Sequence, residues 1–270
     1  MAIVTISRGT LSGGKAIAEE LAKRLGYPCV SRERLFDEAE SFGITKAELN
    51  LEFSRPHGFW KPSPGRRMAA LTILRAAMLK LSRDGDLVYH GFAGHLLLDG
   101  VSHILRVRVI AGMEYRIRSA MEQLFLTREQ AIARIRKEDK ESVYWARYHY
   151  DVDWQDPSLY DVILNLDMIG INSAVETLRL MTEREEFTAD DGSRRAFDDL
   201  MLASMVWAAL GKDSRTCSAN LRVEVTDGTV TITGDAGSNQ VVHDILAVAA
   251  ATTGVREVVN EVGVGSHWIW

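Results

Sequence analysis

Cysteine is scarce in this chain. Cys29 and Cys217 are its only two cysteines, and neither has a partner at CxxC spacing. This excludes the cysteine pairs of a structural zinc site and argues against a disulfide framework. The seven histidines also lack ligand spacing, and His95 and His103 lie in an apolar stretch that favours a structural role. We therefore expect no metal site built from protein side chains.

Long apolar runs are missing as well. No stretch approaches the roughly 20 residues that a bilayer-spanning helix needs. The opening "MAIVTISRG" is too short and too weakly charged for a signal peptide, and we interpret it as the first strand of the fold. These features predict a cytoplasmic protein with no membrane partner.

The sequence has no basic excess. Residues 196–270 contain 4 Lys and Arg against 9 Asp and Glu, whereas residues 1–195 contain 28 of each sign. The net charge of −5 therefore belongs to the C-terminal part. Such a balance argues against nucleic acid or an anionic membrane as the partner there.

Strand patterns alternate with helical patterns over the first two thirds of the chain. The predicted strands are residues 2–7, 87–90, 104–111 and 160–167, and helical periodicity covers 17–25, 68–82 and 173–181. This alternation predicts an α/β fold, a three-layer parallel sheet with helices on both faces. Residues 54–67 hold three of the five prolines and are not expected to form a regular helix.

The pattern changes near residue 184. A polar segment, 184–195, is predicted to be a linker between a domain at 1–183 and a second one at 196–270. The second domain has the order helix, strand, strand, helix, strand. Asp227-Gly228 lies between its first two strands and is a strong hairpin signal. We expect a small α+β unit.

The stretch "ISRGTLSGGKA" directly follows the first predicted strand and opens a helix. Gly9-x4-Gly14-Lys15 fits the phosphate-binding P-loop, in which backbone N–H groups and a lysine bind nucleotide phosphates. The alternative is a tight strand-to-helix turn without a ligand. The predicted ATP-binding residues are Gly9, Thr10, Leu11, Ser12, Gly13, Gly14, Lys15, Ala16 and Ile17.

Ala16 departs from the P-loop pattern, which has Ser or Thr at this position. It removes the hydroxyl that often binds magnesium directly. Magnesium keeps much of its hydration shell, so Mg²⁺ could be held mainly by water and by oxygens of the nucleotide. Thr10 and Ser12 are candidates for additional hydroxyl donors.

Residues 1–181 resemble the cytidylate kinase-like branch of the nucleoside monophosphate kinases. The stretches that carry the resemblance are "ISRGTLSGGKAIAEELAKRLGYPCVSRERL", "LVYHGFAGHLLL", "ILRVRVIAGMEYRI" and "EDKESVYWARYHYDVDWQDPSLYDVILNLD". The resemblance implies a P-loop core, an ATP site, an acceptor-nucleotide site and a mobile lid that carries arginines.

The resemblance also implies roles for cationic residues. Lys15, with Arg136 and Arg147 from the lid, is predicted to act in catalysis, Arg134 and Lys140 being alternatives to the two arginines. Arg32, Arg66 and Arg116 are predicted to bind the acceptor substrate, because guanidinium groups bind phosphate oxygens bidentately. The loop around Arg66 has an alternative interpretation as a solvated surface loop.

Departures from the family pattern leave two hypotheses open. Phe92 and Ser142 stand where the family usually has arginine, and Ser31 stands where an acidic residue often precedes Arg32. The first hypothesis is phosphoryl transfer from ATP to a CMP-like acceptor. The second is a nucleotide-binding regulator with weak or no catalysis.

The C-terminal unit resembles a BON domain, on the stretches "DGTVTITG" and "GVREVVNEV". Such modules are thought to bind lipids, small ligands or proteins, and the acidic charge here favours a regulatory or protein-contact role. The predicted partners are nucleotide substrates and, through this unit, a protein or a second copy of the chain. The apolar end, His267–Trp270, is a candidate dimer contact.

Overall fold

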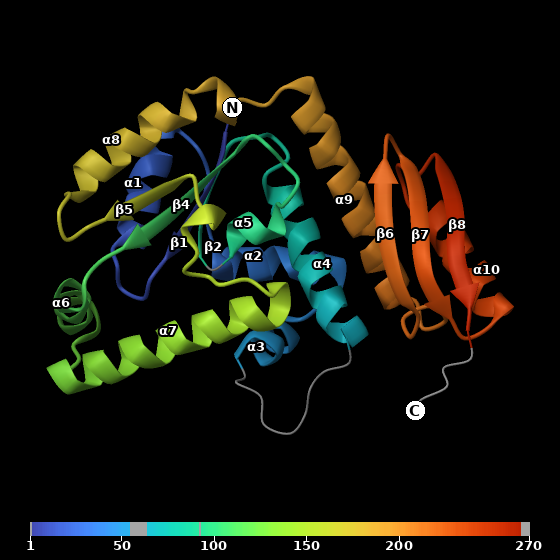
Figure 1. The fold of residues 1–270 in the computed structure, drawn as a ribbon, viewed down its shortest axis with the longest axis horizontal. Coiled ribbons are helices and arrows are strands. Elements are labelled where there is room, and N and C mark those ends of the chain that lie inside the picture. Colours follow the sequence, from blue (N-terminus) through green and yellow to red (C-terminus); the bar gives the residue numbers. More distant parts are fainter. Residues whose placement is uncertain (1, 55–63, 92, 266–270) are drawn as a thin grey trace. The chain divides into compact units, whose positions relative to one another are not determined.

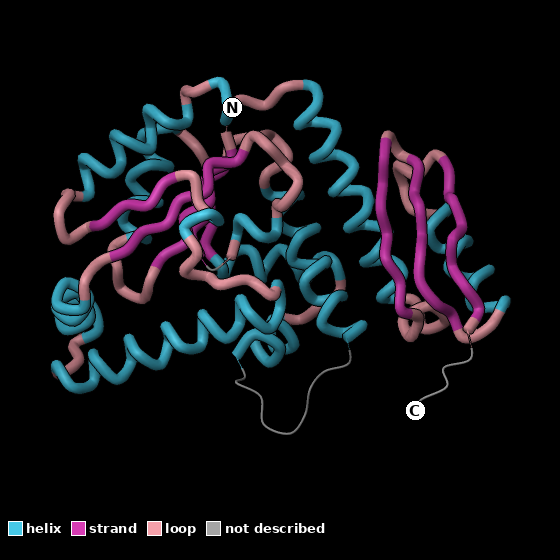
Figure 2. Tube along the Cα trace, viewed as in Figure 1, coloured by secondary structure: helices cyan, strands magenta, loops and turns pink. Residues whose placement is uncertain are grey.

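The structure, a computed structural model, describes residues 2–54, 64–91 and 93–265, without the side chains of 51–54 and 64–68. The chain folds into two compact units (Figures 1 and 2). The first comprises residues 1–35 and 81–190, and the second comprises 36–80 and 191–270. The domain limits expected from the sequence stay a prediction.

A parallel sheet forms the centre of the first unit. Its strands are β1 (Ile3–Arg8), β2 (Cys29–Ser31), β3 (Leu87–Gly91), β4 (Ile104–Ile110) and β5 (Val162–Asn165). They lie in the order β2-β3-β1-β4-β5, and every pairing is parallel. This confirms the predicted α/β fold. Because β1 is central, its carboxyl end at Arg8 lies beside the carboxyl ends of β3 and β4.

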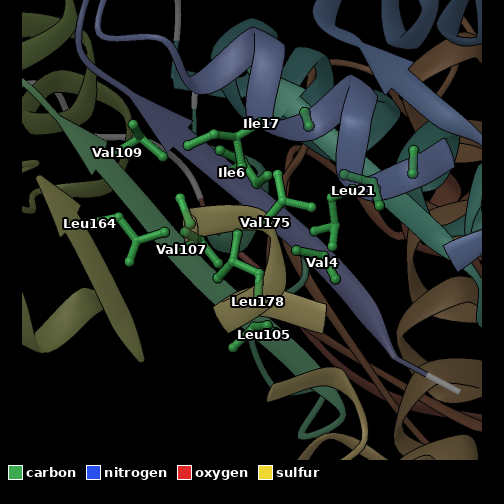
Figure 3. Close-up of a cluster of buried hydrophobic side chains, with 14 of the residues drawn as sticks. Val4, Ile6, Ile17, Leu21, Leu105, Val107, Val109, Leu164, Val175 and Leu178 are labelled. Carbon is green, nitrogen blue, oxygen red and sulfur yellow. The ribbon is translucent and has the colours of Figure 1, made fainter. Parts of the chain in front are cut away.

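Helices α1 (Gly14–Leu25) and α8 (Ile171–Thr182) cover one face of this sheet (Figure 1). Their apolar residues fall at helical spacing and pack on alternate residues of the strands, as expected for amphipathic helices. The resulting core is shown in Figure 3, and its labelled residues are Val4, Ile6, Ile17, Leu21, Leu105, Val107, Val109, Leu164, Val175 and Leu178.

The opposite face of the sheet carries α5 (Gly94–Leu97). Ser7 and Tyr89 point to this face, since they alternate with the core residues of their strands. Ser7 Oγ lies 3.1 Å from His95 Nδ1. Gly94 packs so closely on the Tyr89 ring that an added Cβ would lie 2.3 Å from it. This face therefore contains buried polar groups.

Helices α6 (Met113–Leu124) and α7 (Arg128–Tyr150) follow β4 and pack on one another, and their axes cross steeply (Figure 1). The start of α7 has a capping box, because Thr127 and Gln130 exchange side-chain and backbone hydrogen bonds. Ile117 and Ala120 of α6 pack on Ala131 and Ile135 of α7. Arg136 and Arg147, the arginines expected to come from a lid, both lie in α7.

The second unit includes α3 (Lys46–Ser54), α4 (Pro64–Leu81), α9 (Asp191–Lys212), β6 (Asn220–Thr226), β7 (Thr229–Ala236), α10 (Asn239–Ala250) and β8 (Glu257–Val264). Strands β6 and β7 are antiparallel and β8 is parallel to β7. Apolar side chains of α9 and α10 pack on this sheet, which confirms the predicted α+β unit. Helix α2 (Arg32–Ala39) spans the point at which the chain passes from the first unit to the second.

The hairpin between β6 and β7 turns at Asp227 and Gly228, as predicted. Both residues have positive φ, 48° and 79°, which the favoured two-residue turn requires. The carboxylate of Asp199 in α9 accepts hydrogen bonds from both of their amides. The turn is therefore stabilised by Asp199 of α9 as well as by the conformations of its own two residues.

The structure differs from the sequence-based expectations at two boundaries. Helix α4 begins at Pro64, inside the segment expected to be irregular, because proline is tolerated in the first turn of a helix. Helix α9 begins at Asp191, inside the expected linker. Phe92, the loop 55–63 and His267–Trp270 lie outside the described residues. No described helix is both long and apolar enough to cross a membrane.

Candidate phosphate-binding site

The loop from Gly9 to Gly13 joins β1 to α1 at the carboxyl edge of the sheet. Gly13, the N-cap residue, has φ 86°, makes no side-chain capping hydrogen bond, and no acidic residue follows in the first turn. Most helices satisfy their first amides with a capping side chain or an acidic group. The positive end of the α1 dipole is therefore left without a compensating group from its own first turn.

The loop amides fall into two sets. Gly9 N donates to the Val109 carbonyl at 3.2 Å and Ser12 N donates to the Gly9 carbonyl at 3.1 Å. Within the described chain, the amides of Gly14, Lys15 and Ala16 donate to no protein acceptor. The first set fixes the bend, and the second is available for an anion at the start of the helix.

Three of the predicted ATP-binding residues shape the loop with their side chains. Leu11, with φ 59°, packs into the apolar cluster between α6 and α7. Ser12 is fully buried and its hydroxyl donates to the Val109 carbonyl at 3.0 Å, so the expectation of a free hydroxyl donor at this position is wrong. Ile17 is fully buried and its amide donates to the Gly13 carbonyl.

Lys15 lies at the open side of this helix start. Its side chain is 63% exposed and Nζ lies 3.7 Å from the Glu19 carboxylate, one turn further along α1. A solvent-exposed pair of this kind contributes little free energy, about 0.3–0.5 kcal/mol. Lys15 can therefore leave Glu19 for a phosphate at small cost.

A cavity of about 110 Å³ lies next to the loop, and we call it the arginine cavity. It opens between the ends of β1 and β4 and one face of α7. Its lining residues are Arg8, Gly9, Arg108, Ile110, Ala111, Arg116, Asp139, Ser142, Val143, Trp154 and Gln155. Since Gly9 belongs to both the loop and the cavity, two features suited to anions are adjacent.

Arg116 was predicted to bind substrate, and it lines this cavity. Its Nε donates to the Thr10 carbonyl at 2.6 Å, and its Nη2 donates to Asp139 Oδ1 at 2.6 Å. The side chain is only 11% exposed. Arg116 therefore links the loop at Thr10 to α7, and its charge is paired with Asp139 at the cavity wall.

Sequence reasoning missed Arg8 and Arg108. Arg8 is the last residue of β1, and its buried Nε has no hydrogen-bond partner among the described residues. Arg108 donates to the Trp154 carbonyl, and its Cζ lies 5.5 Å from the Trp154 ring centroid and 5.4 Å from that of Tyr160. The sequence signal for Arg108 was a charged residue in an apolar strand. In β4, Arg106 and Arg108 alternate with the buried residues Leu105, Val107 and Val109.

The remaining predicted residues do not line the cavity. Arg136 and Arg147 are exposed on α7, one turn before Asp139 and one turn after Val143. Arg32 begins α2 and lies 4.0 Å from Glu33. Arg66 falls in α4, where the structure does not describe its side chain.

The chain offers few ligands for magnesium. Among the described residues, no three His, Cys, Asp or Glu side chains are grouped as a metal site. Ala16 has no hydroxyl, and the hydroxyl of Ser12 is occupied by Val109. Any Mg²⁺ that accompanies a nucleotide would therefore depend on water and phosphate oxygens for its coordination.

The close contact between Gly14 and Arg8 gives a testable prediction. A Cβ added at Gly14 would lie 2.7 Å from Arg8 Cβ and 3.3 Å from Val109 Cβ. Gly14→Ala should therefore push α1 away from β1, lower the free energy of unfolding by about 1–3 kcal/mol and weaken ATP binding. Urea denaturation and calorimetry with ATP measure the two effects.

The matched control is Gly170→Ala. Gly170 is also at a helix start, the N-cap of α8, but an added Cβ there meets nothing within 4 Å and φ is −74°. We expect this variant to change stability by no more than about 0.5 kcal/mol. Equal effects of the two substitutions would contradict the close-packing argument.

Comparison with known proteins identifies the family of each part of the chain. Residues 3–168 match the family model described as the cytidylate kinase-like family, and residues 198–266 match the BON domain. A cytidylate kinase of Ignicoccus hospitalis is 26% identical over 184 residues, which cover 67% of this chain and 99% of that protein. A cytidylate kinase of Pyrobaculum aerophilum is 25% identical over 179 residues, covering 65% and 89%.

Among solved structures, an uncharacterized protein from Eubacterium ventriosum superposes with a TM-score of 0.54 at 17% identity. The match covers 67% of this chain and 98% of that one, and it shows a shared fold. Both resemblances inferred from the sequence are confirmed. The family match covers more than half of the chain, and the chain therefore belongs to the cytidylate kinase-like family, with a BON domain at its C-terminal end.

Proposed function

We propose that this protein transfers the γ-phosphoryl group of ATP to a nucleoside monophosphate, with CMP as the preferred acceptor. The relatives named cytidylate kinase support the acceptor class. The observation that carries the proposal is the adjacency of two anion-binding features, the uncapped start of α1 and the arginine cavity, which share Gly9. A kinase must bring two phosphate groups together in this way.

The roles follow from position. The amides of Gly14, Lys15 and Ala16 bind phosphate oxygens of ATP, and the Lys15 ammonium stabilises charge on the transferred group. Arg116 holds the loop in shape through the Thr10 carbonyl. Mg²⁺ bound to the nucleotide, with water as its other ligands, would offset phosphate charge. Arg136 and Arg147 lie on the α7 side that flanks the cavity, from which a shift of α7 would direct them to phosphates.

The decisive experiment is a turnover assay with ATP and Mg²⁺, using CMP, dCMP, UMP and AMP as acceptors. Formation of ADP together with the matching nucleoside diphosphate, fastest with CMP, is the expected result. ADP formation that does not depend on any acceptor would indicate hydrolysis and would reject the proposal. Product with UMP or AMP but not with CMP would retain the reaction and reject the preferred acceptor.

A second candidate is a nucleotide-binding regulator, and two observations favour it. The loop hydroxyl of Ser12 is occupied internally, and Arg116 is neutralised by Asp139 at 2.6 Å, so the site offers less charge than its residue list suggests. ATP binding measured by calorimetry, with no product from any acceptor, would select this candidate over the enzyme.

We propose a protein-contact role for the BON domain, in agreement with its acidic balance. The partner proposed first is a second copy of the chain. Light scattering over a hundredfold range of concentration tests this, because a self-associating chain shows an increasing mass. A constant monomer mass would reject the homodimer.

A further inference from the structure

Strand β8 is an open edge of the sheet in the BON domain. The strand order β6-β7-β8 places it at one end of the sheet (Figure 1), and in the described chain no strand pairs with its far side. An unpaired edge presents a row of N–H and C=O groups to which another strand can add. The eight residues of β8, "EVVNEVGV", include no proline or lysine, which edge strands often use to prevent such addition.

Alternate residues of β8 direct their backbone groups away from the sheet. Gly265 N donates to the Ala236 carbonyl of β7 at 3.4 Å, so the odd-numbered residues at this end of the chain face β7. The even-numbered residues therefore face outward. The amide of Val262 agrees with this, because it donates to Asn260 Oδ1 at 3.0 Å instead of to β7. A carbonyl of an added strand could replace that side-chain acceptor.

The two edges of this sheet differ in how well their apolar residues are covered. Leu221 and Val223 of β6 are only 8% and 9% exposed, and α9 packs along this strand. Val258 and Val262 of β8 lie on the same face of the sheet but are only half-buried. Val264, at the end of β8, is 51% exposed. The core is therefore less completely covered along β8 than along β6.

The charges of β8 select one register for pairing with a second copy of the strand. Two-fold pairing is antiparallel, and the two core faces coincide only if the axis passes through a residue. An axis at Val259 would place Glu257 opposite Glu261, and an axis at Glu261 would place this residue opposite itself. Like charges directly opposite each other are destabilising. An axis at Asn260 avoids both, because Val259 then lies opposite Glu261, and Glu257 opposite Gly263.

The register with its axis at Asn260 also extends the core. Val258 of each copy would lie opposite Val262 of the other, on the face that α9 and α10 cover within one chain. Burying these half-exposed side chains against each other is favourable. A two-fold contact uses the same surface on both copies, so association ends at a dimer.

We propose that the BON domain self-associates by antiparallel addition of β8 to β8 of a second copy, with the two-fold axis at Asn260. The result is one continuous sheet across both copies. This inference rests on the proposed contact between the BON domain and a second copy, and it assigns that contact to one strand and one register.

The first test changes the charge opposite Glu261 in the full chain. Val259→Glu places a carboxylate there twice in the dimer, whereas Val259→Lys places an ammonium group. Sedimentation equilibrium should show the dissociation constant of the dimer increase at least about fivefold in V259E and decrease in V259K. Adding Glu261→Lys to V259E should restore association, and melting temperatures report folding. Equal dissociation constants for V259E and V259K would overturn the proposal.

Glu224→Lys on β6 is the matched control, since it changes an exposed charge at the other edge of the same sheet. It should leave the dissociation constant within about twofold of the wild-type value. A larger effect of E224K than of V259E would place the contact at β6 and overturn the assignment to β8.

Crosslinking tests the register. Residues at the axis lie about 5.5 Å apart between Cα atoms, within the range of about 4.4–6.8 Å that a disulfide spans. Oxidised Asn260→Cys should therefore form a covalent dimer. Val259→Cys should not, because diagonal neighbours lie about 7–8 Å apart. The wild type, with exposed Cys29 and Cys217, gives the background. Crosslinking of V259C but not of N260C would overturn the register.

The outcomes separate this inference from the proposed homodimer. A wild-type dimer that is insensitive to V259E and V259K and does not crosslink in N260C would retain the homodimer and reject the β8 contact. A monomer mass at every concentration would reject the homodimer itself. Dimerisation only after removal of residues 266–270 would show that the chain's own end covers β8, and it would overturn the inference for the intact chain.

Discussion

Replacing Lys15 with alanine is expected to lower the rate of phosphoryl transfer about 10²–10³-fold, the range found when a preorganised donor to developing charge is removed. Lys15 lies at the uncapped start of α1 and is bound only by a weak, exposed contact with Glu19. Its loss should affect the transition state more than folding. Steady-state kinetics with ATP and CMP, together with thermal melting, separate the two effects.

Lys23→Ala is the matched control for this experiment. Lys23 is exposed in the last turn of the same helix, far along the chain from the loop. The substitution removes the same charge and the same side chain as Lys15→Ala, but at the other end of α1 from the phosphate site. We expect an unchanged rate. If K23A and K15A lowered the rate equally, the effect would come from net charge, and the role given to Lys15 would be wrong.

Acidification should destabilise the first unit through His95. This side chain is 5% exposed, and burial, followed by the charge of Arg106, lowers its pKa from 6.5 to about 4. Between these values the unfolded chain binds a proton that the folded chain does not. Stability from this group is therefore complete above about pH 6.5, falls as the pH decreases and is lost below about pH 4. The loss is on the order of 3 kcal/mol.

The structure explains why His95 resists protonation. Its Nδ1 lies 3.1 Å from Ser7 Oγ, and the Tyr160 ring lies 4.9 Å away. Its Nε2 is buried and has no hydrogen-bond partner in the part of the chain that the structure describes. A charged imidazole would place a proton on Nε2 where nothing accepts it. Urea denaturation at several pH values between 4 and 7.5 measures the slope, and His95→Gln should flatten it.

Burial also lowers the pKa of His90, so some pH dependence will remain in that variant. His243→Gln, at an exposed position of α10, is the control and should retain the wild-type slope. Identical slopes for the wild type and H95Q would show that His95 does not carry the effect.

The sequence predicted the strand–loop–helix context of the P-loop because the signal is local. Glycine spacing, a preceding apolar run and a following helical period lie within Ile3–Leu25. Arg116 could be predicted because the family pattern marks it. The occupation of the Ser12 hydroxyl could not, because its acceptor, the carbonyl of Val109, lies 97 residues away.

Arg8 and Arg108 were missed for a related reason. Arg8 ends β1 and Arg108 lies within β4, and a strand pattern states which face a residue lies on but not what meets it there. The cavity forms only when β1, β4 and α7 are brought together. Their place in the lining of one cavity is therefore a property of the fold and cannot be read from either strand alone.

The insertion of Leu11 into the packing of α6 and α7 has a mechanical consequence. The residue is held in a left-handed conformation, and its partly buried side chain packs against the cluster that includes Ile117, Ala131 and Ile135. The loop from Gly9 to Gly13 therefore cannot change its conformation independently of α6 and α7. Removing one methyl group from this packing should weaken ATP binding, although the substituted side chain does not contact ATP.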